Sequence, residues 1–386
     1  MRIAVNTRLL LKDKLDGIGW FTYETLKRIT QNNPEHEFIF LFDRKFDDEF
    51  IFSSNIQPVV IAPQARHPVL WYLWLEYSVK HALKKFRADI FLSPDGFIPL
   101  KSDIPSVAVI HDINFVHHSE DIPLLTRWYY LHYFPLFAQK SVRIATVSEY
   151  SKDDICSSYQ IAPEKIDVVY NGANEIYTPL DERTIAQTKQ KYTAGNEYFI
   201  FIGSLLPRKN IVRLLQAFDR FKNLILDTNL EGIKLVIVGK PMFMTNDIWQ
   251  TYNTMECKAD VIFTGRLDAP ELHRVLGAAT AMTFIPYFEG FGIPIIEAMN
   301  CDVPVMTSDI TSMPEVSGDA ALLVNPFSID SIVAGMLKIT TDTALRKNLI
   351  AKEQINKLRF SWDATAEKLW NCILEAQKAA STENER

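Results

Sequence analysis

Short apolar runs alternate with longer amphipathic stretches along most of the chain. Runs rich in isoleucine, valine and phenylalanine are separated by segments whose apolar positions recur at helical spacing. This alternation predicts βαβ units, in which parallel strands are buried on both faces. The expected strands are 2–6, 38–42, 89–93, 106–110, 143–147, 198–203, 234–239, 261–265, 281–285, 303–307 and 321–324.

The βα rhythm restarts after a polar, turn-rich stretch at 171–196. A chain of 386 residues also exceeds one ordinary domain. We therefore predict an α/β protein of two doubly wound, Rossmann-like domains, 1–178 and 179–360, that face a central cleft. A last helical pattern begins after Ser361, which can cap it, and we expect 361–386 to return to the first domain.

Charge and cysteine content exclude several classes of protein. The 41 Lys+Arg against 47 Asp+Glu give a net charge of −6, so nucleic acid is not an expected partner. The four cysteines are too widely spaced for a paired metal site and favour a reducing compartment. Neither a signal peptide nor a run of about 18 apolar residues is recognisable. We expect a cytoplasmic protein, with attachment to a membrane surface left open.

The most informative stretch, 287–299, leaves the expected strand at 281–285 and opens a helix. Gly290 and Gly292 let a ligand approach the backbone, and a helix N-terminus offers unpaired N–H groups to a phosphate. Glu289 lies in the loop and Glu297 about one turn into the helix, so both carboxylates can face one ligand. They suit ribose or sugar hydroxyls, although each glutamate alone fits equally well as an ordinary acidic residue of a helix start.

A second glycine turn, beginning at Gly203 and Ser204, also leads from a strand into a helix. Arg208 and Lys209 follow in that turn. Cations at a helix start are unfavourable to the helix dipole, which favours a role as phosphate partners over a role as a solvated basic pair.

The first domain offers weaker signals. Gly17 and Gly19 precede a helix, but Thr22 stands where a dinucleotide fingerprint has its third glycine. His111 ends the expected strand at 106–110 and can donate to a sugar hydroxyl or a leaving-group oxygen. It also fits a capped structural histidine, with Asp112 orienting it. Walker, zincin, nucleophile-elbow and Asp-x-Asp motifs are absent from the sequence.

The ordered set of motifs resembles the retaining glycosyltransferases of family four, whose fold is called GT-B. The resemblance spans nearly the whole chain and rests on Gly17-Ile-Gly19, His111, Asn171-Gly172, 203–210, 263–267 and, above all, the spacing Glu289-x7-Glu297. Many members carry an arginine directly after the glycine where this chain has Ser204. Arg208 then either takes over the missing guanidinium or points outward.

The resemblance implies that the second domain binds a nucleotide-sugar. It implies that Glu297 bonds the ribose and Glu289 the donor sugar, while His111 faces the reacting sugar. Further donor contacts are implied for Gly17, Gly19, Gly203, Ser204, Arg208, Lys209, Arg266, Leu267 and the amides of Gly290, Phe291 and Gly292. Of these, Arg208, Lys209 and the loop amides hold the diphosphate, Gly19 approaches the phosphates, and Arg266 and Leu267 lie by the base.

The implied activity is transfer of a hexose from a nucleotide-sugar to a glycan or lipid-linked acceptor, in surface polysaccharide or glycoconjugate synthesis. Retention of anomeric configuration is implied, and mannose from GDP-mannose is the expected donor, with UDP-hexoses close behind. The donor is a substrate, so no cofactor is expected. Fixed cations and helix amides can stabilise the leaving diphosphate, and no Asp-x-Asp recruits a divalent cation, so no metal is expected either.

Three alternatives remain open at this point. A nucleotide-sugar epimerase or a glycosyl phosphorylase can share the same two-domain fold. A nicotinamide-dependent dehydrogenase is disfavoured by the broken glycine fingerprint. A non-catalytic protein would bind the nucleotide-sugar without turnover.

A helix expected over 69–87 carries two stripes. One anchors it to the core: Trp71, Leu75, Val79, Ala82 and Phe86. The neighbouring stripe mixes aromatic and basic side chains: Leu70, Trp74, Tyr77, His81 and Lys84 or Lys85. That mixture, with a second run at 127–134, suits an anionic membrane surface, such as the inner face of the plasma membrane. The alternative is that both stripes pack against neighbouring helices.

Overall fold

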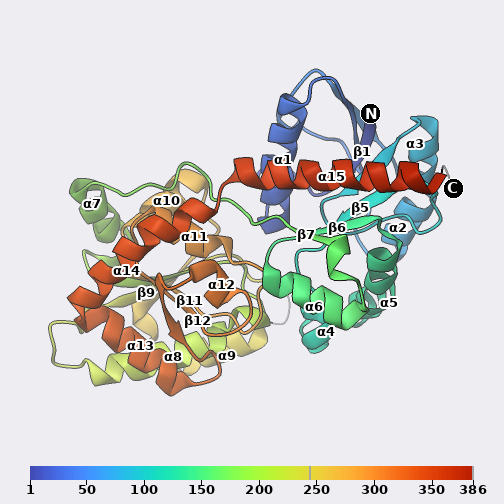
Figure 1. Ribbon diagram of the computed structural model, residues 1–386. Helices are drawn as coiled ribbons and strands as arrows, with labels where there is room; N and C mark the ends of the chain where they lie inside the picture. Colours follow the sequence, from blue (N-terminus) through green and yellow to red (C-terminus); the bar gives the residue numbers. More distant parts are fainter. Residues whose placement is uncertain (243–244, 385–386) are drawn as a thin grey trace. The chain divides into compact units, whose positions relative to one another are not determined.

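In the computed structural model, which describes residues 1–242 and 245–384, the chain divides into two compact units. The first is Met1–Gly172 together with Ser361–Arg386, and the second is Ala173–Phe360. Each unit is a parallel sheet accompanied by helices (Figure 1). The predicted α/β architecture of two doubly wound units is confirmed. The division falls after Gly172 rather than after 178.

The first unit contains a seven-stranded parallel sheet in the order β3-β2-β1-β4-β5-β6-β7. Successive strands are added toward one edge of the sheet from β1 to β3 and toward the other edge from β4 to β7. The reversal lies between β1 and β4, and such a switch point is where open α/β sheets bind ligands. The strands are β1 (Arg2–Asn6), β2 (Glu37–Phe42), β3 (Ile56–Val60), β4 (Ile90–Ser93), β5 (Ser106–Val109), β6 (Arg143–Thr146) and β7 (Ile166–Val168).

Two of these strands were not expected from the sequence. Strand β3 contains Pro58, which cannot donate to a ladder and is tolerated at a sheet edge. Strand β7 has three residues, too few for a recognisable apolar run. Both lie at the edges of the sheet, where little burial is needed.

The helices of the first unit include one that comes from the far end of the sequence. Helix α15 lies beside α1 (Figure 1). Gly172 allows this return, because a Cβ there would lie 2.4 Å from the backbone nitrogen of Trp362. The helices are α1 (Gly17–Asn32), α2 (Pro68–Leu73), α3 (Lys80–Lys85), α4 (Asn114–His117), α5 (Leu124–Lys140), α6 (Glu149–Tyr159) and α15 (Trp362–Asn384).

The expected helix at 69–87 is interrupted by a π-helical segment, Trp74–Val79, between α2 and α3. Trp74, expected on the outer stripe, is 1% exposed and donates from Nε1 to the carbonyl of Ile61 at 2.9 Å. That part of the expectation is wrong. Tyr77 and the later members of the stripe, His81, Lys84 and Lys85, are exposed.

The second unit repeats the plan with a six-stranded parallel sheet, β10-β9-β8-β11-β12-β13. Its switch point lies between β8 and β11. The strands are β8 (Tyr198–Ile202), β9 (Lys234–Val238), β10 (Val261–Gly265), β11 (Ala281–Phe284), β12 (Val305–Ser308) and β13 (Ala321–Val324). The helices are α7 (Glu182–Thr193), α8 (Ile211–Leu224), α9 (Asn246–Thr254), α10 (Ala269–Gly277), α11 (Ile293–Asn300), α12 (Met313–Ser317), α13 (Ile329–Thr341) and α14 (Thr343–Asn356).

Candidate active site

Three charged side chains meet at the switch point of the second unit. Arg208 and Lys209 belong to a 3-10 turn, Pro207–Lys209, that follows β8, and Glu289 lies in the loop that follows β11. Both cations donate to the same oxygen, Oε2 of Glu289. Because β8 and β11 are neighbouring parallel strands, their carboxyl ends bring these distant residues together.

Hydrogen bonds to backbone carbonyl oxygens hold the two loops in place. The N–H of Tyr287 donates to the carbonyl of Arg208 at 3.0 Å, and Nη1 of Arg208 lies 3.3 Å from the carbonyl oxygen of Phe288. The hydroxyl of Ser312 donates to the carbonyl of Glu289 at 2.8 Å. Arg208 therefore points into the cluster rather than outward, and the charges are fixed in place before any ligand arrives.

The cluster is shielded from water, which strengthens its electrostatic influence. Lys209 is 9% exposed, and its ammonium lies 4.7 Å from the centre of the Phe284 ring. Burial opposes ionisation of Glu289, but the charges of Arg208 and Lys209 outweigh it and hold the pKa of the carboxyl below its ordinary value. Two cations and one carboxylate sum to a net charge of +1, so these three side chains can attract an anion.

Glu297 lies one turn inside α11 and is half-buried. Burial raises the pKa of Glu297 to about 7, and the nearby hydroxyl of Tyr177 opposes that rise. A carboxylate offers about four acceptor positions. Glu297 therefore has acceptor capacity for the hydroxyl groups of a ligand.

The start of α11 is shaped for close approach to the backbone. Gly292 caps the helix with φ +90°, and a Cβ there would lie 2.9 Å from Cε of Met313. The N–H groups of a first helical turn have no acceptor within the helix, and the helix dipole adds positive potential there. Gly290 and Phe291 are buried in the same loop. This segment and the cation cluster adjoin through Glu289.

Gly203 and Ser204 form the turn directly after β8. Gly239, which follows the neighbouring strand β9, was not among the expected site residues. A Cβ on Gly239 would lie 1.9 Å from the carbonyl oxygen of Gly203, so only glycine lets the two turns approach. The signal was present in the repeated pattern of a strand ending in glycine, at 203, 239 and 265.

Arg266 and Leu267 follow β10, the edge strand of the second unit. Arg266 is exposed and Leu267 is half-buried. They lie two strands away from β8 in the sheet order, whereas Arg208, Lys209 and Glu289 are in direct contact. The structure thus brings together the residues expected to bind the diphosphate and the donor sugar. The two residues expected to bind the base lie apart from them, at the edge of the sheet.

His111 follows β5 in the first unit. Its Nε2 lies 2.8 Å from the carbonyl oxygen of Pro94, and its ring packs edge-on against Phe21 at 4.9 Å between centroids. Burial lowers the pKa of His111, although the contact with Pro94 and the nearby carboxylate of Asp112 oppose this. A carbonyl can only accept, so Nε2 carries the proton and Nδ1 is the acceptor of the neutral ring. The free acceptor Nδ1 favours a hydrogen bond that a sugar hydroxyl donates to His111, whereas the sequence led us to expect that His111 would be the donor.

Gly17 and Gly19 form the first turn of α1 rather than a loop before it. Asp16 caps this helix by accepting from the N–H of Gly19 at 2.9 Å. A Cβ on Gly19 would lie 3.3 Å from the carbonyl oxygen of Leu9, whereas a Cβ on Gly17 would meet nothing within 4 Å. Gly19 therefore serves close packing, and Gly17 is the more accessible of the two.

A buried polar network at the switch point of the first unit was not expected. Arg8 Nε and Asp95 Oδ2 are 2.6 Å apart, and Asn6 Nδ2 donates to Asp95 Oδ1 at 2.8 Å. The guanidinium of Arg8 lies 4.2 Å from the centre of the Phe97 ring. Asn6 ends β1, Arg8 follows it, and Asp95 follows β4, so the signal in the sequence was the presence of polar residues at the carboxyl ends of two strands.

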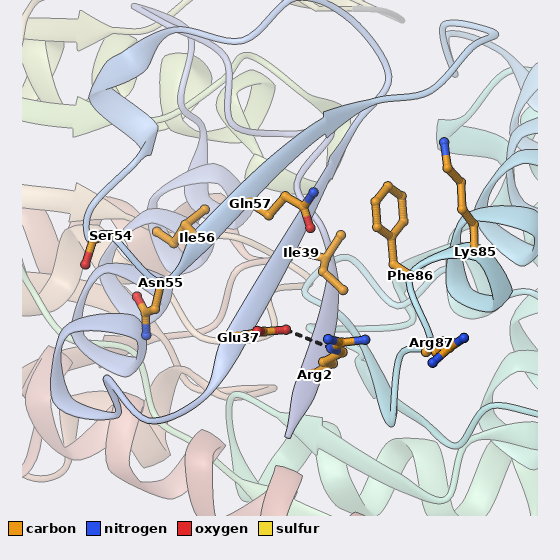
Figure 2. A pocket seen from close by; sticks show the side chains of 10 residues that line it. All are labelled: Arg2, Glu37, Ile39, Ser54, Asn55, Ile56, Gln57, Lys85, Phe86 and Arg87. Atoms are coloured by element: carbon orange, nitrogen blue, oxygen red, sulfur yellow. Dashed lines mark hydrogen bonds and ion pairs between the residues drawn. The ribbon is translucent and has the colours of Figure 1, made fainter.

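One depression lies away from these residues. Figure 2 shows it at the amino ends of β1, β2 and β3, with Arg2 and Glu37 paired at 2.7 Å across its floor and Lys85, Phe86 and Arg87 beside them. It measures about 600 Å³. Because open α/β sheets bind ligands at the carboxyl ends of their strands, we do not assign the site to this depression.

Among residues 1–242 and 245–384, no group of three or more His, Cys, Asp or Glu side chains is arranged to hold a metal ion. Within the same residues, every helix is too short or too polar to cross a membrane.

Curated relatives resemble the chain along most of its length. An O-antigen chain mannosyltransferase B of Escherichia coli is 27% identical over 367 residues, which cover 92% of this chain and 94% of the relative. The O-antigen chain mannosyltransferase RfbU of Salmonella typhimurium is 28% identical over 260 residues, 67% of each chain.

A solved structure shows the same fold. The crystal structure of HepE of Anabaena in complex with UDP-glucose matches with a TM-score of 0.74 at 16% identity, over 97% of this chain and 100% of the other. Two parallel-sheet units of this kind are the GT-B fold. The chain belongs to the glycosyltransferases: the model of Glycosyltransferase Family 4 matches residues 15–175, and that of Glycosyl transferases group 1 matches residues 182–355.

Proposed function

We propose that the enzyme transfers mannose from GDP-mannose to a glycan or lipid-linked acceptor, with retention of anomeric configuration and without a bound metal ion or cofactor. The names of the two O-antigen mannosyltransferases support mannose and a surface polysaccharide acceptor. The observation that carries the proposal is the shared bond of Arg208 and Lys209 to Oε2 of Glu289 at the switch point.

This cluster accounts for the chemical step that is hardest for a transferase. Cleavage of the bond between the sugar and the diphosphate leaves extra negative charge on the departing phosphate. Arg208 and Lys209 can shift their hydrogen bonds from Glu289 to the phosphate oxygens, while the N–H groups at the start of α11 support the same charge. Glu289 is then released to accept hydroxyls of the donor sugar.

The ribose and the reacting sugar require further acceptors. Glu297, one turn inside α11, is assigned to the ribose hydroxyls. Nδ1 of His111 is assigned to a hydroxyl of the donor sugar. Arg266 and Leu267 are assigned to the base, and Gly17 to the donor phosphates.

A nucleotide panel tests the proposed donor. The thermal midpoint of the protein is measured with GDP, UDP, ADP and dTDP, since a ligand at about 100 times its dissociation constant stabilises by about 2.7 kcal/mol. The largest shift is expected with GDP, followed by transfer of mannose when GDP-mannose and an acceptor polysaccharide are supplied. A larger shift with UDP would show that the enzyme recognises uracil and not guanine. No shift with any nucleotide would contradict the assigned site.

We further propose that the enzyme works at the cytoplasmic face of the plasma membrane. The exposed apolar side chains of α2 and α5, with Tyr77 beside them, form what we call the aromatic face: Val69, Leu73, Tyr77, Leu124, Leu125, Trp128 and Leu131. The two helices are joined by the Trp71 ring, which stacks on Tyr130 with 5.8 Å between centroids.

A cation borders the aromatic face, and two more follow on the next helix. Lys101 is exposed and donates to the hydroxyl of Tyr72 at 3.0 Å, with its ammonium 5.6 Å from that ring's centre. Lys84 and Lys85 are exposed on α3. Exposed aromatic side chains beside cations suit an interface of anionic headgroups and acyl chains, which is where a lipid-linked acceptor is presented.

A further inference from the structure

An arginine at the switch point of the first unit is buried but only partly paired. Arg8 is 8% exposed, and its Nε lies 2.6 Å from Oδ2 of Asp95. Among residues 1–242 and 245–384, nothing accepts a hydrogen bond from Nη1 or Nη2 of Arg8. These two nitrogens are not sealed from solvent, in contrast to the buried hydroxyl of Thr7. A buried cation that keeps accessible donors at a switch point indicates a ligand that supplies acceptors.

The guanidinium of Arg8 is oriented before any ligand arrives. Asp95, which pairs with Nε, is itself held, because it accepts a hydrogen bond from the hydroxyl of Ser93 at 2.9 Å. The guanidinium carbon lies 4.2 Å from the centre of the Phe97 ring and 5.8 Å from that of Trp71. We call Trp71 and Phe97 the aromatic pair. Because the carboxylate and the aromatic pair both fix the planar group, Nη1 and Nη2 have a set direction.

Tyr130 brings a second polar group to the aromatic pair. Its ring stacks on Trp71 with 5.8 Å between centroids and packs edge-on against Phe97 at 6.0 Å. Within the part of the chain that the structure describes, the Tyr130 hydroxyl makes no hydrogen bond, and it too is not sealed from solvent. Burial raises the pKa of Tyr130, and the charge of Arg8 opposes the rise, in agreement with a hydroxyl near the guanidinium. Two unpartnered polar groups therefore border the same aromatic rings, a combination typical of small-molecule sites.

The charges around Arg8 favour a neutral ligand. Arg8 and Asp95 sum to zero, whereas the cation cluster at Glu289 in the second unit sums to +1. A phosphate would bring negative charge close to the Asp95 carboxylate, and like charges repel. The hydroxyl oxygens of a sugar accept hydrogen bonds without this penalty, and an aromatic ring offers apolar surface to the C–H face of a sugar. The site therefore suits an uncharged sugar.

The turn that holds Arg8 also contacts His111. The carbonyl oxygen of Pro94 lies 2.8 Å from Nε2 of His111, and the next residue, Asp95, pairs with Arg8. His111 is assigned above to a hydroxyl of the donor sugar. Because neighbouring residues of one turn contact both side chains, a sugar bound by Arg8 would lie beside the sugar that is transferred.

We propose that Arg8 and Tyr130 select the acceptor by donating hydrogen bonds to hydroxyl oxygens of a neutral terminal sugar. The inference rests on the proposed function, since it assumes that the chain transfers mannose to a glycan. It adds the class of acceptor, a glycan that ends in an uncharged sugar, and two specificity-determining residues.

The test begins with the unaltered protein and a panel of soluble acceptors. Transfer from GDP-mannose is measured to the methyl glycosides of mannose, glucose, galactose and N-acetylglucosamine. At least one of them should accept mannose, and inorganic phosphate should not compete with it. Transfer to none of the four by a protein that does modify acceptor polysaccharide, or competition between phosphate and the glycoside, would overturn the proposal.

Two variants then test the residues with the best glycoside. Tyr130→Phe removes one hydroxyl, and Arg8→Lys keeps a charge beside Asp95 but loses the two terminal nitrogens. The KM for the glycoside should rise about tenfold in each, while the GDP dissociation constant and the KM for GDP-mannose stay within about twofold. Arg143→Lys is the matched control and should equal the wild type, because Arg143 also pairs with a carboxylate, Asp167, at 2.6 Å but lies at the start of β6.

Glycosides that lack a single hydroxyl separate ligand binding from a structural role. A hydroxyl that Arg8 binds contributes nothing to affinity once it is removed. One deoxy glycoside should therefore show the same KM with the wild type and with Arg8→Lys. If Arg8→Lys raised the KM of every deoxy glycoside by the same factor, Arg8 would act only through the structure, and the proposal would be wrong.

The outcomes separate this inference from the proposed function. If both variants keep the wild-type KM for the glycoside, the inference is overturned and the transfer of mannose stands. If they weaken GDP and the glycoside equally, Arg8 serves the donor and not the acceptor, which also overturns it. If the unaltered protein transfers no mannose from GDP-mannose to any acceptor, the proposed function fails, and the role of Arg8 fails with it.

Discussion

Lys209 donates to Oε2 of Glu289, the same oxygen that Arg208 reaches, while the Lys209 ammonium stays 4.7 Å from the centre of the Phe284 ring. A lysine held in this way on a carboxylate and an aromatic ring is oriented before the donor arrives. The diphosphate then meets charges whose position costs little reorganisation, which is the condition under which electrostatic stabilisation is most effective.

Glu289 and His111 should matter for turnover more than for nucleotide affinity, because both are assigned to the sugar and not to the base or ribose. For Glu289→Gln and His111→Ala, kcat should fall about a hundredfold, while the GDP dissociation constant stays within about threefold of the wild type. Steady-state kinetics and GDP calorimetry give the two quantities. If kcat and the affinity for GDP fell by the same factor, Glu289 and His111 would have structural roles instead.

Glu297 should make the ligand-free protein less stable as the pH rises. Its pKa is about 7 in the folded protein against 4.5 when unperturbed, so the folded state holds more protons than the unfolded state between these values. The penalty grows as the pH rises from 4.5 and is complete above 7, where it reaches about 3 kcal/mol.

Glu297→Gln should therefore raise the Tm at about pH 8 and change it little at about pH 4.5. Thermal unfolding of both proteins at the two pH values measures this, with Glu367→Gln, an exposed glutamate on α15, as the control. An equal change in Tm at both pH values would show that Glu297 does not titrate in this range.

Transfer should survive removal of divalent cations, because Arg208, Lys209 and the N–H groups of α11 meet the charge of the leaving diphosphate. The measurement is the transfer rate with excess EDTA against an untreated sample, and it should be unchanged. Activity that disappears and returns on addition of magnesium or manganese would show that a bound cation is needed.

The aromatic face should bind vesicles that contain anionic lipid. Tyr77→Ser with Trp128→Ser, and separately Lys84→Glu with Lys85→Glu, should reduce co-sedimentation with phosphatidylglycerol vesicles at low salt. Leu358→Ser is the matched control, because Leu358 is 80% exposed but belongs to the second unit. Binding that is indifferent to lipid charge and to these changes would leave a water-soluble acceptor as the better hypothesis.

The sequence predicted the parallel sheets because buried strands such as Tyr198–Ile202 are continuous apolar runs. It also predicted which turns would be polar, as with Arg208, Lys209 and Glu289. It did not predict the shared bond to Oε2, since strand order decides which turns meet, and local patterns do not encode strand order.

Other differences have local physical causes. Trp74 is buried and donates to the carbonyl of Ile61, a tertiary contact that helical spacing cannot reveal. His111 was recognised by its place after a strand, but its tautomer depends on the carbonyl of Pro94.

The assignment of the donor site is tested most directly by Lys209→Ala and Glu297→Ala, assayed together for GDP affinity and for mannose transfer from GDP-mannose. The first variant loses a charge on the diphosphate and the second an acceptor for the ribose, so each should weaken donor binding and lower turnover about a hundredfold. Wild-type kinetics with unchanged nucleotide affinity in both variants would contradict the donor site at the switch point of the second unit.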